Sequence, residues 1–153
     1  MRSNPKISGR NISTATLLMV ALLQSCPSIA AGALAVGLPT DVARQGFAAG
    51  HSINAADMDT AQQRALDSCQ KSVGGSDVAK QLCKVVATFS EQCYALAIDP
   101  KANTPGVGWA IADNLQMADA QAIDACRTRA GRARRDFCAV LSPEDHGCDG
   151  NAK

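Results

Sequence analysis

The chain has 153 residues, of which 46% are hydrophobic and 3% aromatic, with 15 basic and 14 acidic residues. This length suits one folded domain rather than two. The nearly balanced charge argues against nucleic acid as a partner, since domains that bind it carry a basic excess.

The first thirty residues are typical of a secretory signal peptide. Arg2, Lys6 and Arg10 are followed by an apolar run at 16–23 and by a small-residue end at 28–30, with no acidic residue. This three-part layout predicts export. The apolar run is far shorter than the ~20 residues that a membrane-spanning helix needs.

Two routes of processing fit this segment. Cleavage after Ala30 would leave a soluble mature domain, residues 31–153. Alternatively, the residues Leu-Gln-Ser-Cys at 23–26 resemble a lipobox, in which Cys26 is acylated and holds the protein on a membrane, although Gln24 fits that pattern poorly. We therefore expect membrane contact only if Cys26 is lipidated. Loss of residues 1–30 leaves 12 basic against 14 acidic residues, which makes the mature domain slightly acidic.

The remainder of the chain contains one segment twice, at about 33–93 and 95–148. Cys93 aligns with Cys148 in this comparison. Four shorter matches carry the repeat: ALAV at 33–36 with ALAI at 95–98, GFA at 46–48 with GWA at 108–110, ALDSC at 65–69 with AIDAC at 122–126, and CKVV at 83–86 with CAVL at 138–141.

Each copy is predicted to form strand, strand, helix and strand. The strands are expected at 32–36, 46–49 and 84–89 in the first copy and at 94–98, 108–112 and 137–141 in the second, because these are short apolar runs bounded by turn residues. The second strands carry the aligned aromatics Phe47 and Trp109, and we expect Trp109 in the core.

The helices follow these second strands. Asp57 and Asn114 are the expected N-caps, and Gly74–Gly75 and Gly131 are the expected ends. An alanine-rich apolar stripe recurs with helical spacing in both copies. We predict an α+β fold: two pseudo-symmetric strand-strand-helix-strand repeats form one disulfide-bonded domain, with one sheet and both helices on one of its faces.

Six cysteines follow the signal segment, and an even number in an exported chain predicts a disulfide framework. Zinc and thioredoxin-like chemistry are disfavoured because no closely spaced cysteine pair is present, and we expect no metal or other cofactor. Several pairings are compatible with exchange of the copies. We favour local bridges in each copy and one bridge between copies: Cys69–Cys83, Cys126–Cys138 and Cys93–Cys148.

The ordered set of these motifs resembles a family of small secreted bacterial domains, domain of unknown function 4189. The family shows a G-[WF]-A strand, an Ala-rich helix ending in A-[LI]-x-x-C, a C-x-V-[VL] strand and a further cysteine. The resemblance covers about residues 33–148 and implies an exported, disulfide-bonded α+β domain. It supplies no catalytic or ligand residues. The first copy departs from the pattern at Phe47, where tryptophan is commoner.

The most distinctive feature outside the repeat is a basic run near the end of the second helix. Five guanidinium groups there could bind carboxylates or phosphates, or simply be solvated beside the helix C-terminus. The candidate binding residues are Arg127, Arg129, Arg132, Arg134 and Arg135.

Catalytic patterns are weak. A small hydrolase using His146, or the aligned pair Asp67 and Asp124, is the alternative from the enzyme class. His51 is expected at the surface or at a strand end. No serine lies in a recognised nucleophile motif.

We therefore expect an exported, non-enzymatic binding module of the bacterial envelope, periplasmic or secreted, whose partner is an unknown protein or an anionic envelope component. A secreted effector acting outside the producing cell is the second alternative.

Overall fold

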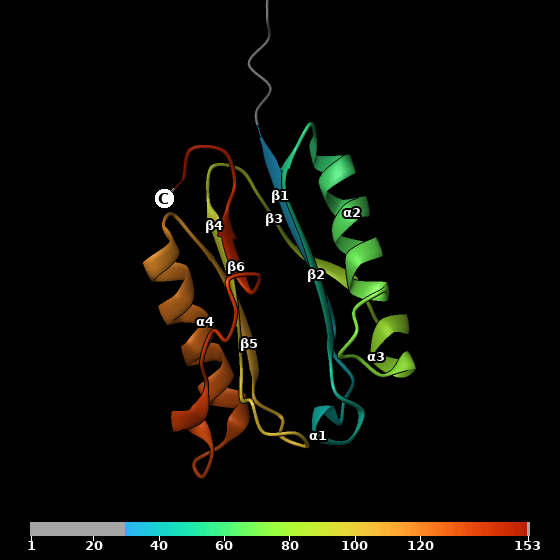
Figure 1. Ribbon diagram of the computed structural model, residues 1–153, viewed down its shortest axis with the longest axis vertical. Coiled ribbons are helices and arrows are strands. Elements are labelled where there is room, and N and C mark those ends of the chain that lie inside the picture. The colour runs from blue at the N-terminus through green and yellow to red at the C-terminus, as the bar shows by residue number, and fades with distance from the viewer. Residues whose placement is uncertain (1–29, 153) are drawn as a thin grey trace, which may run out of the picture.

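The computed structural model describes residues 30–152 (Figure 1). The expected signal peptide, apart from Ala30, and the expected lipidation site Cys26 lie outside these residues. Within the described chain, no helix combines the length and the apolar character needed to cross a membrane.

The first half of the domain is a three-stranded antiparallel sheet with one long helix. The strand order is β2-β1-β3, so the first strand of the chain is central. Two short helices, α1 and α3, were not predicted. The elements are β1 (Ala31–Gly37), α1 (Val42–Gln45), β2 (Ala48–Ala55), α2 (Met58–Gln70), α3 (Asp77–Gln81) and β3 (Lys84–Phe89).

The second half repeats this arrangement. Its sheet has the order β5-β4-β6, again with the first strand in the centre and antiparallel neighbours. The elements are β4 (Cys93–Ile98), β5 (Val107–Ala112), α4 (Leu115–Ala130), the 3₁₀ helix η1 (Arg135–Phe137) and β6 (His146–Cys148).

The two sheets face each other, with α2 and α4 on the outer sides (Figure 1). The α+β class is confirmed, but the expected single sheet with both helices on one face is wrong. The reason lies in the central strands, which are buried on both faces. In β1, Ala33 and Ala35 pack toward α2, whereas Leu34 and Val36 pack toward the other sheet.

Side-chain size differs between the layers. The helix–sheet contacts are built mainly from alanine and cysteine, whereas the contact between the sheets contains larger side chains such as Leu34, Phe89 and Tyr94. Gly50 and Gly108 let the helices approach closely. An added Cβ would lie 2.1 Å from the Cys69 nitrogen at Gly50 and 2.2 Å from the Cys126 nitrogen at Gly108.

The predicted N-caps are confirmed. Asp57 accepts a hydrogen bond from the Thr60 N–H at 2.7 Å, and Asn114 accepts one from the Met117 N–H at 2.9 Å. Gly131 follows α4 with φ of 73°, as expected of a helix end. The expected end of the first helix at Gly74–Gly75 is wrong, because α2 already ends at Gln70 and a new helix, α3, follows.

All three favoured disulfide pairings are confirmed: Cys69–Cys83, Cys126–Cys138 and Cys93–Cys148. The last one does not join the two halves, however. Cys93 opens the central strand β4 and lies directly opposite Cys148 on β6, in the same sheet. Among the described residues, every bridge is therefore internal to one half, and the sheets are held together by non-covalent contacts.

The strand registers correct the alignment of the two copies. His51 pairs with Leu34 in the first sheet, and Trp109 pairs with Leu96 in the second. Because Leu34 and Leu96 are equivalent, His51 is the counterpart of Trp109. The expected equivalence of Phe47 and Trp109 is wrong, since β2 lies later in the chain than predicted and Phe47 precedes it.

The expected final strand at 137–141 is also wrong. The chain there forms η1, followed by a single bridge between Ala139 and Ile98. Pairing with β4 resumes only at His146. A turn containing Pro143, which lacks a backbone N–H, interrupts the second ladder here, whereas β3 pairs with β1 from Lys84 to Phe89 with one register shift.

Candidate functional site

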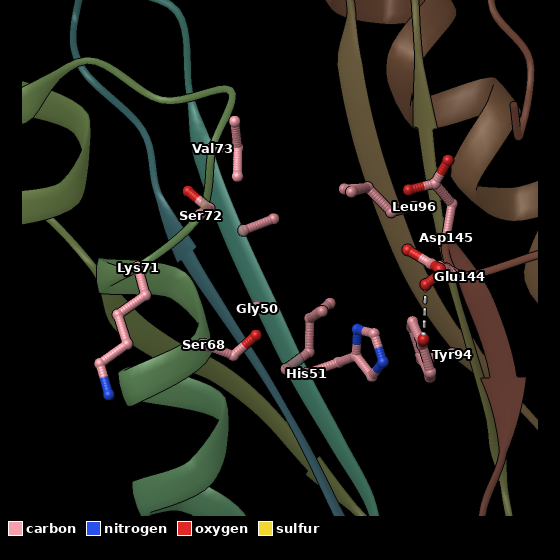
Figure 2. Close-up of a pocket in the computed structure, with 12 residues that line it drawn as sticks. Gly50, His51, Ser68, Lys71, Ser72, Val73, Tyr94, Leu96, Glu144 and Asp145 are labelled. Carbon is pink, nitrogen blue, oxygen red and sulfur yellow. Dashed lines mark hydrogen bonds between the residues drawn. The ribbon is translucent and has the colours of Figure 1, made fainter. Parts of the chain in front are cut away.

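A cleft of about 350 Å³ lies between the sheets, at the outer edge of β2 (Figure 2). Its wall from the first half includes His51 on β2 and Ser72 after α2. Tyr94 and Leu96 on β4, together with the turn before β6, provide the opposite wall. The cleft volume lies in the range of small-ligand sites.

His51 and Tyr94 meet inside this cleft. Their rings stack with a centroid separation of 4.6 Å and an interplanar angle of 26°. Burial lowers the pKa of His51, while the charges of Asp145 and Glu144 oppose that shift. Burial, assisted by the same two carboxylates, raises the pKa of Tyr94. At neutral pH the cleft therefore holds an uncharged imidazole beside an uncharged phenol.

The turn before β6 supplies the carboxylates. The Tyr94 hydroxyl donates to the Glu144 carbonyl at 2.9 Å, and the Leu96 N–H donates to the Asp145 carbonyl at 2.7 Å. The Ser142 N–H donates to the Asp145 side chain at 3.0 Å, and the Glu144 N–H donates to the Ser142 hydroxyl at 3.1 Å. These bonds fix both acidic residues against the cleft.

A second groove, of about 360 Å³, surrounds Trp109. This groove is the pseudo-symmetric counterpart of the cleft. Trp109 on β5 faces β3 across the groove, just as His51 on β2 faces the turn before β6 across the cleft. Its lining is mostly apolar and includes Val36, Val86 and the stem of Lys84. The Arg129 guanidinium lies over the Trp109 ring, 4.7 Å from its centroid. The expectation that Trp109 lies in the core holds only in part, because Trp109 is partly buried and packs against the core cluster between the sheets.

The five predicted arginines separate into two groups. Arg134 makes two hydrogen bonds to the buried carboxylate of Asp99, at 2.8 and 2.5 Å, and lies over the Phe137 ring. Arg129 donates to the Val107 carbonyl at 2.9 Å. Both guanidinium groups therefore have partners within the fold, and the region is not one uniform basic surface.

The remaining three, Arg127, Arg132 and Arg135, line one depression of about 340 Å³ at the end of α4. Asp124 is the one carboxylate among its lining residues, and it pairs with Arg127 at 3.1 Å. Arg135 contacts Asp136 at 3.7 Å. This depression, called the basic depression below, keeps an excess of positive charge.

The residues considered for hydrolysis lie apart. Asp67 on α2 pairs with Lys71, whereas Asp124 is on α4, at the opposite outer side of the molecule (Figure 1). His146 on β6 contacts Asp119 through Nδ1 at 2.8 Å. Within residues 30–152, no group of three or more histidine, cysteine or acidic residues is arranged to hold a metal ion.

Sequence reasoning missed the cleft. It placed His51 at the surface because the second strand was expected to end at residue 49, whereas β2 continues to Ala55. Successive side chains of a strand point to opposite faces of the sheet. The small residues Gly50 and Ser52 fit the face that packs against the helix, so this alternation could have indicated that His51 points to the other face. Glu144 and Asp145 were not among the candidate site residues.

Fold and disulfides together define a small, cross-linked α+β domain made of two pseudo-equivalent layers. The chain belongs to the family described as Domain of unknown function (DUF4189), whose model matches residues 31–142. This confirms the resemblance stated from the repeated motifs. Comparison with curated proteins and with solved structures gave no match.

Proposed function

We propose that the protein is an exported, non-enzymatic binding module of the bacterial envelope, and that its basic depression binds anionic groups. Three disulfides within one small domain support an oxidising compartment, since such bridges are rare where thiols are kept reduced. The layout of the first thirty residues supports export by the secretory route.

One observation carries the anion-binding proposal. Of the five arginines, the fold uses Arg129 and Arg134 internally, whereas Arg127, Arg132 and Arg135 share one depression with a single carboxylate, Asp124. Guanidinium groups bind phosphate and carboxylate oxygens through paired hydrogen bonds. A cluster of this kind suits a polyanionic component of the envelope.

The arrangement of the other polar residues favours binding over catalysis. Asp67 and Asp124 belong to helices on opposite outer sides, so a shared acid–base role has no geometric support. His146 contacts Asp119, which belongs to the helix packed on the same sheet.

Titration with inorganic tripolyphosphate tests the proposed anion site. Replacement of Arg127, Arg132 and Arg135 by glutamine should weaken binding at least tenfold and flatten its dependence on salt. In the control variant, Arg44, Arg64 and Lys80 are replaced by glutamine, which removes the same amount of positive charge outside the basic depression. Equal affinity of both triple variants would show that the basic depression is not the anion site.

Export and anchoring need a separate test. Cell fractionation should find the processed protein outside the cytoplasm. Globomycin, which blocks maturation of lipoproteins, should leave processing unchanged if cleavage follows Ala30, and should block it if Cys26 is lipidated.

A further inference from the structure

The two pseudo-equivalent grooves carry opposite charge. The groove at Trp109 is mostly apolar and its charged lining residue is Lys84. The cleft at His51 has the carboxylates of Glu144 and Asp145 on one wall. This difference arises from two departures from symmetry: histidine replaces tryptophan on the second strand, and a turn interrupts the strand opposite it.

The acidic wall is held rigidly. The backbone carbonyls of Glu144 and Asp145 accept hydrogen bonds from Tyr94 and Leu96, which belong to the central strand β4. The Asp145 carboxylate is also held in place, because it accepts a hydrogen bond from the Ser142 N–H at 3.0 Å. Preorganised charges of this kind cost less entropy when a ligand arrives.

The other titratable side chains that line the cleft do not neutralise this wall. The Lys71 ammonium pairs with Asp67 at 2.7 Å and points away from Glu144 and Asp145 (Figure 2). Burial lowers the pKa of His51, so its ring is uncharged at neutral pH. The cleft is therefore negative overall, which favours a cationic occupant.

The remaining lining suits an apolar stem. Leu34, Leu96 and Val73 line the cleft together with the stacked rings of His51 and Tyr94. Val73 is fully exposed at the rim of the cleft.

We propose that this cleft binds a ligand carrying an ammonium or guanidinium group on an apolar stem, as the side chains of lysine and arginine do. Glu144 and Asp145 receive the cationic group. Leu96, the His51 ring and, at the rim, Val73 pack against the stem. The site is independent of the basic depression, which is lined by different residues at the end of α4.

Matched small molecules test the proposal through amide chemical shifts of the oxidised protein. N-acetyl-lysine methylamide carries an ammonium group on an apolar stem that is attached to a peptide backbone. In n-butylamine the ammonium group and the stem are present without the backbone. N-acetyl-norleucine methylamide has the backbone and a four-carbon apolar stem but no charge. Both amines should shift the amides of His51, Leu96 and Asp145 in a saturable way. The norleucine compound should bind at least tenfold more weakly. Tighter binding of the lysine compound than of butylamine would identify a peptide as the source of the group.

Three variants, one of them a control, assign the effect to the cleft. Glu144→Gln with Asp145→Asn removes the charge and keeps an oxygen that can accept from the Ser142 N–H, and it should weaken binding of the lysine compound at least tenfold. Asp59→Asn with Asp77→Asn removes the same charge from exposed helix starts and should leave binding unchanged. His51→Trp introduces the residue of the equivalent position and should fill the cleft and abolish binding, with folding checked by its melting curve.

Three results would overturn the proposal. These are equal affinity for the lysine and norleucine compounds, undiminished binding by the Glu144→Gln, Asp145→Asn variant, and shifts that map away from the cleft. Because tripolyphosphate binding is measured separately, failure here would leave the anion-binding proposal intact.

Discussion

The buried carboxylate of Asp149 accepts a hydrogen bond from the backbone N–H of Asn54, with 2.6 Å between nitrogen and oxygen. In return, the Asn54 side chain accepts from the Gly150 N–H at 3.0 Å. Asn54 belongs to β2, whereas Asp149 follows β6. These bonds connect the two sheets at one end, where no disulfide does so.

Replacing Asp149 by alanine should therefore destabilise the protein by about 2 kcal/mol, since hydrogen bonds to charged groups contribute roughly that amount. Chemical denaturation measures the change. Asp59→Ala, at an exposed position of α2, is the control and should alter stability by less than about 0.5 kcal/mol. A loss at Asp149 no larger than at Asp59 would mean that this connection contributes no stability.

The absence of a bridge between the sheets predicts a specific fragment pattern. The chain's glutamates are Glu91, between the two halves, and Glu144. Cleavage after both, in denaturant and without reduction, should release the fragment ending at Glu91 with its own Cys69–Cys83 bridge. Fragments 92–144 and 145–153 should stay joined through Cys93–Cys148. Mass spectrometry separates this result from the contrary one, in which all fragments remain in one species.

The two glycines where a helix approaches a sheet most closely should not tolerate replacement by a residue with a side chain. Gly50→Ala and Gly108→Ala each place a Cβ little more than 2 Å from helix backbone, so each should cost about 3 kcal/mol, at the upper end of usual overpacking effects. Gly74→Ala is the matched control, because an added Cβ there meets nothing within 4 Å. Thermal unfolding would contradict the prediction if all three variants melted together.

Acid should weaken the contact between Asp99 and Arg134. Hydrogen bonds from Arg134 are the main cause that lowers the pKa of Asp99 to about 2, from its ordinary value of 3.8. Because the unfolded chain takes up this proton first, the stabilisation is complete above pH 3.8 and is lost as the pH falls toward 2.

Arg134→Gln should flatten this part of the stability profile, measured by denaturation between pH 2 and pH 6. Arg64→Gln, an exposed change on α2, should keep the slope of the unmodified protein. Parallel profiles for Arg134→Gln and the unmodified protein would show that the pair does not govern the acid response.

Local signals in the sequence predicted local structure well. Asp57 and Asn114 cap their helices because an N-cap depends on a side chain and the N–H three residues later, both visible in the sequence. Equal positions in the two copies narrowed the disulfide pairings to several, among which the local bridges Cys69–Cys83 and Cys126–Cys138 were favoured and are confirmed.

The arrangement of the layers was not predictable in the same way. Alternation of alanine with larger residues in β1 shows that both faces are buried, but it does not say whether a helix or a sheet covers each face. The equivalence of His51 and Trp109 was hidden by the chance similarity of the residues around Phe47. Only the strand registers reveal this equivalence, and they depend on contacts between residues that are distant in the sequence.

The segment between β3 and β4 is only three residues long, Ser90 to Gln92, and it joins two layers that have the same strand order. In a dimer of identical chains, a substitution in one groove would appear in both. A single chain that carries both layers has no such constraint. It can keep a tryptophan in one groove for packing and place a histidine and two carboxylates in the other, so that half of the symmetric scaffold preserves the fold while the other half is free to acquire a ligand.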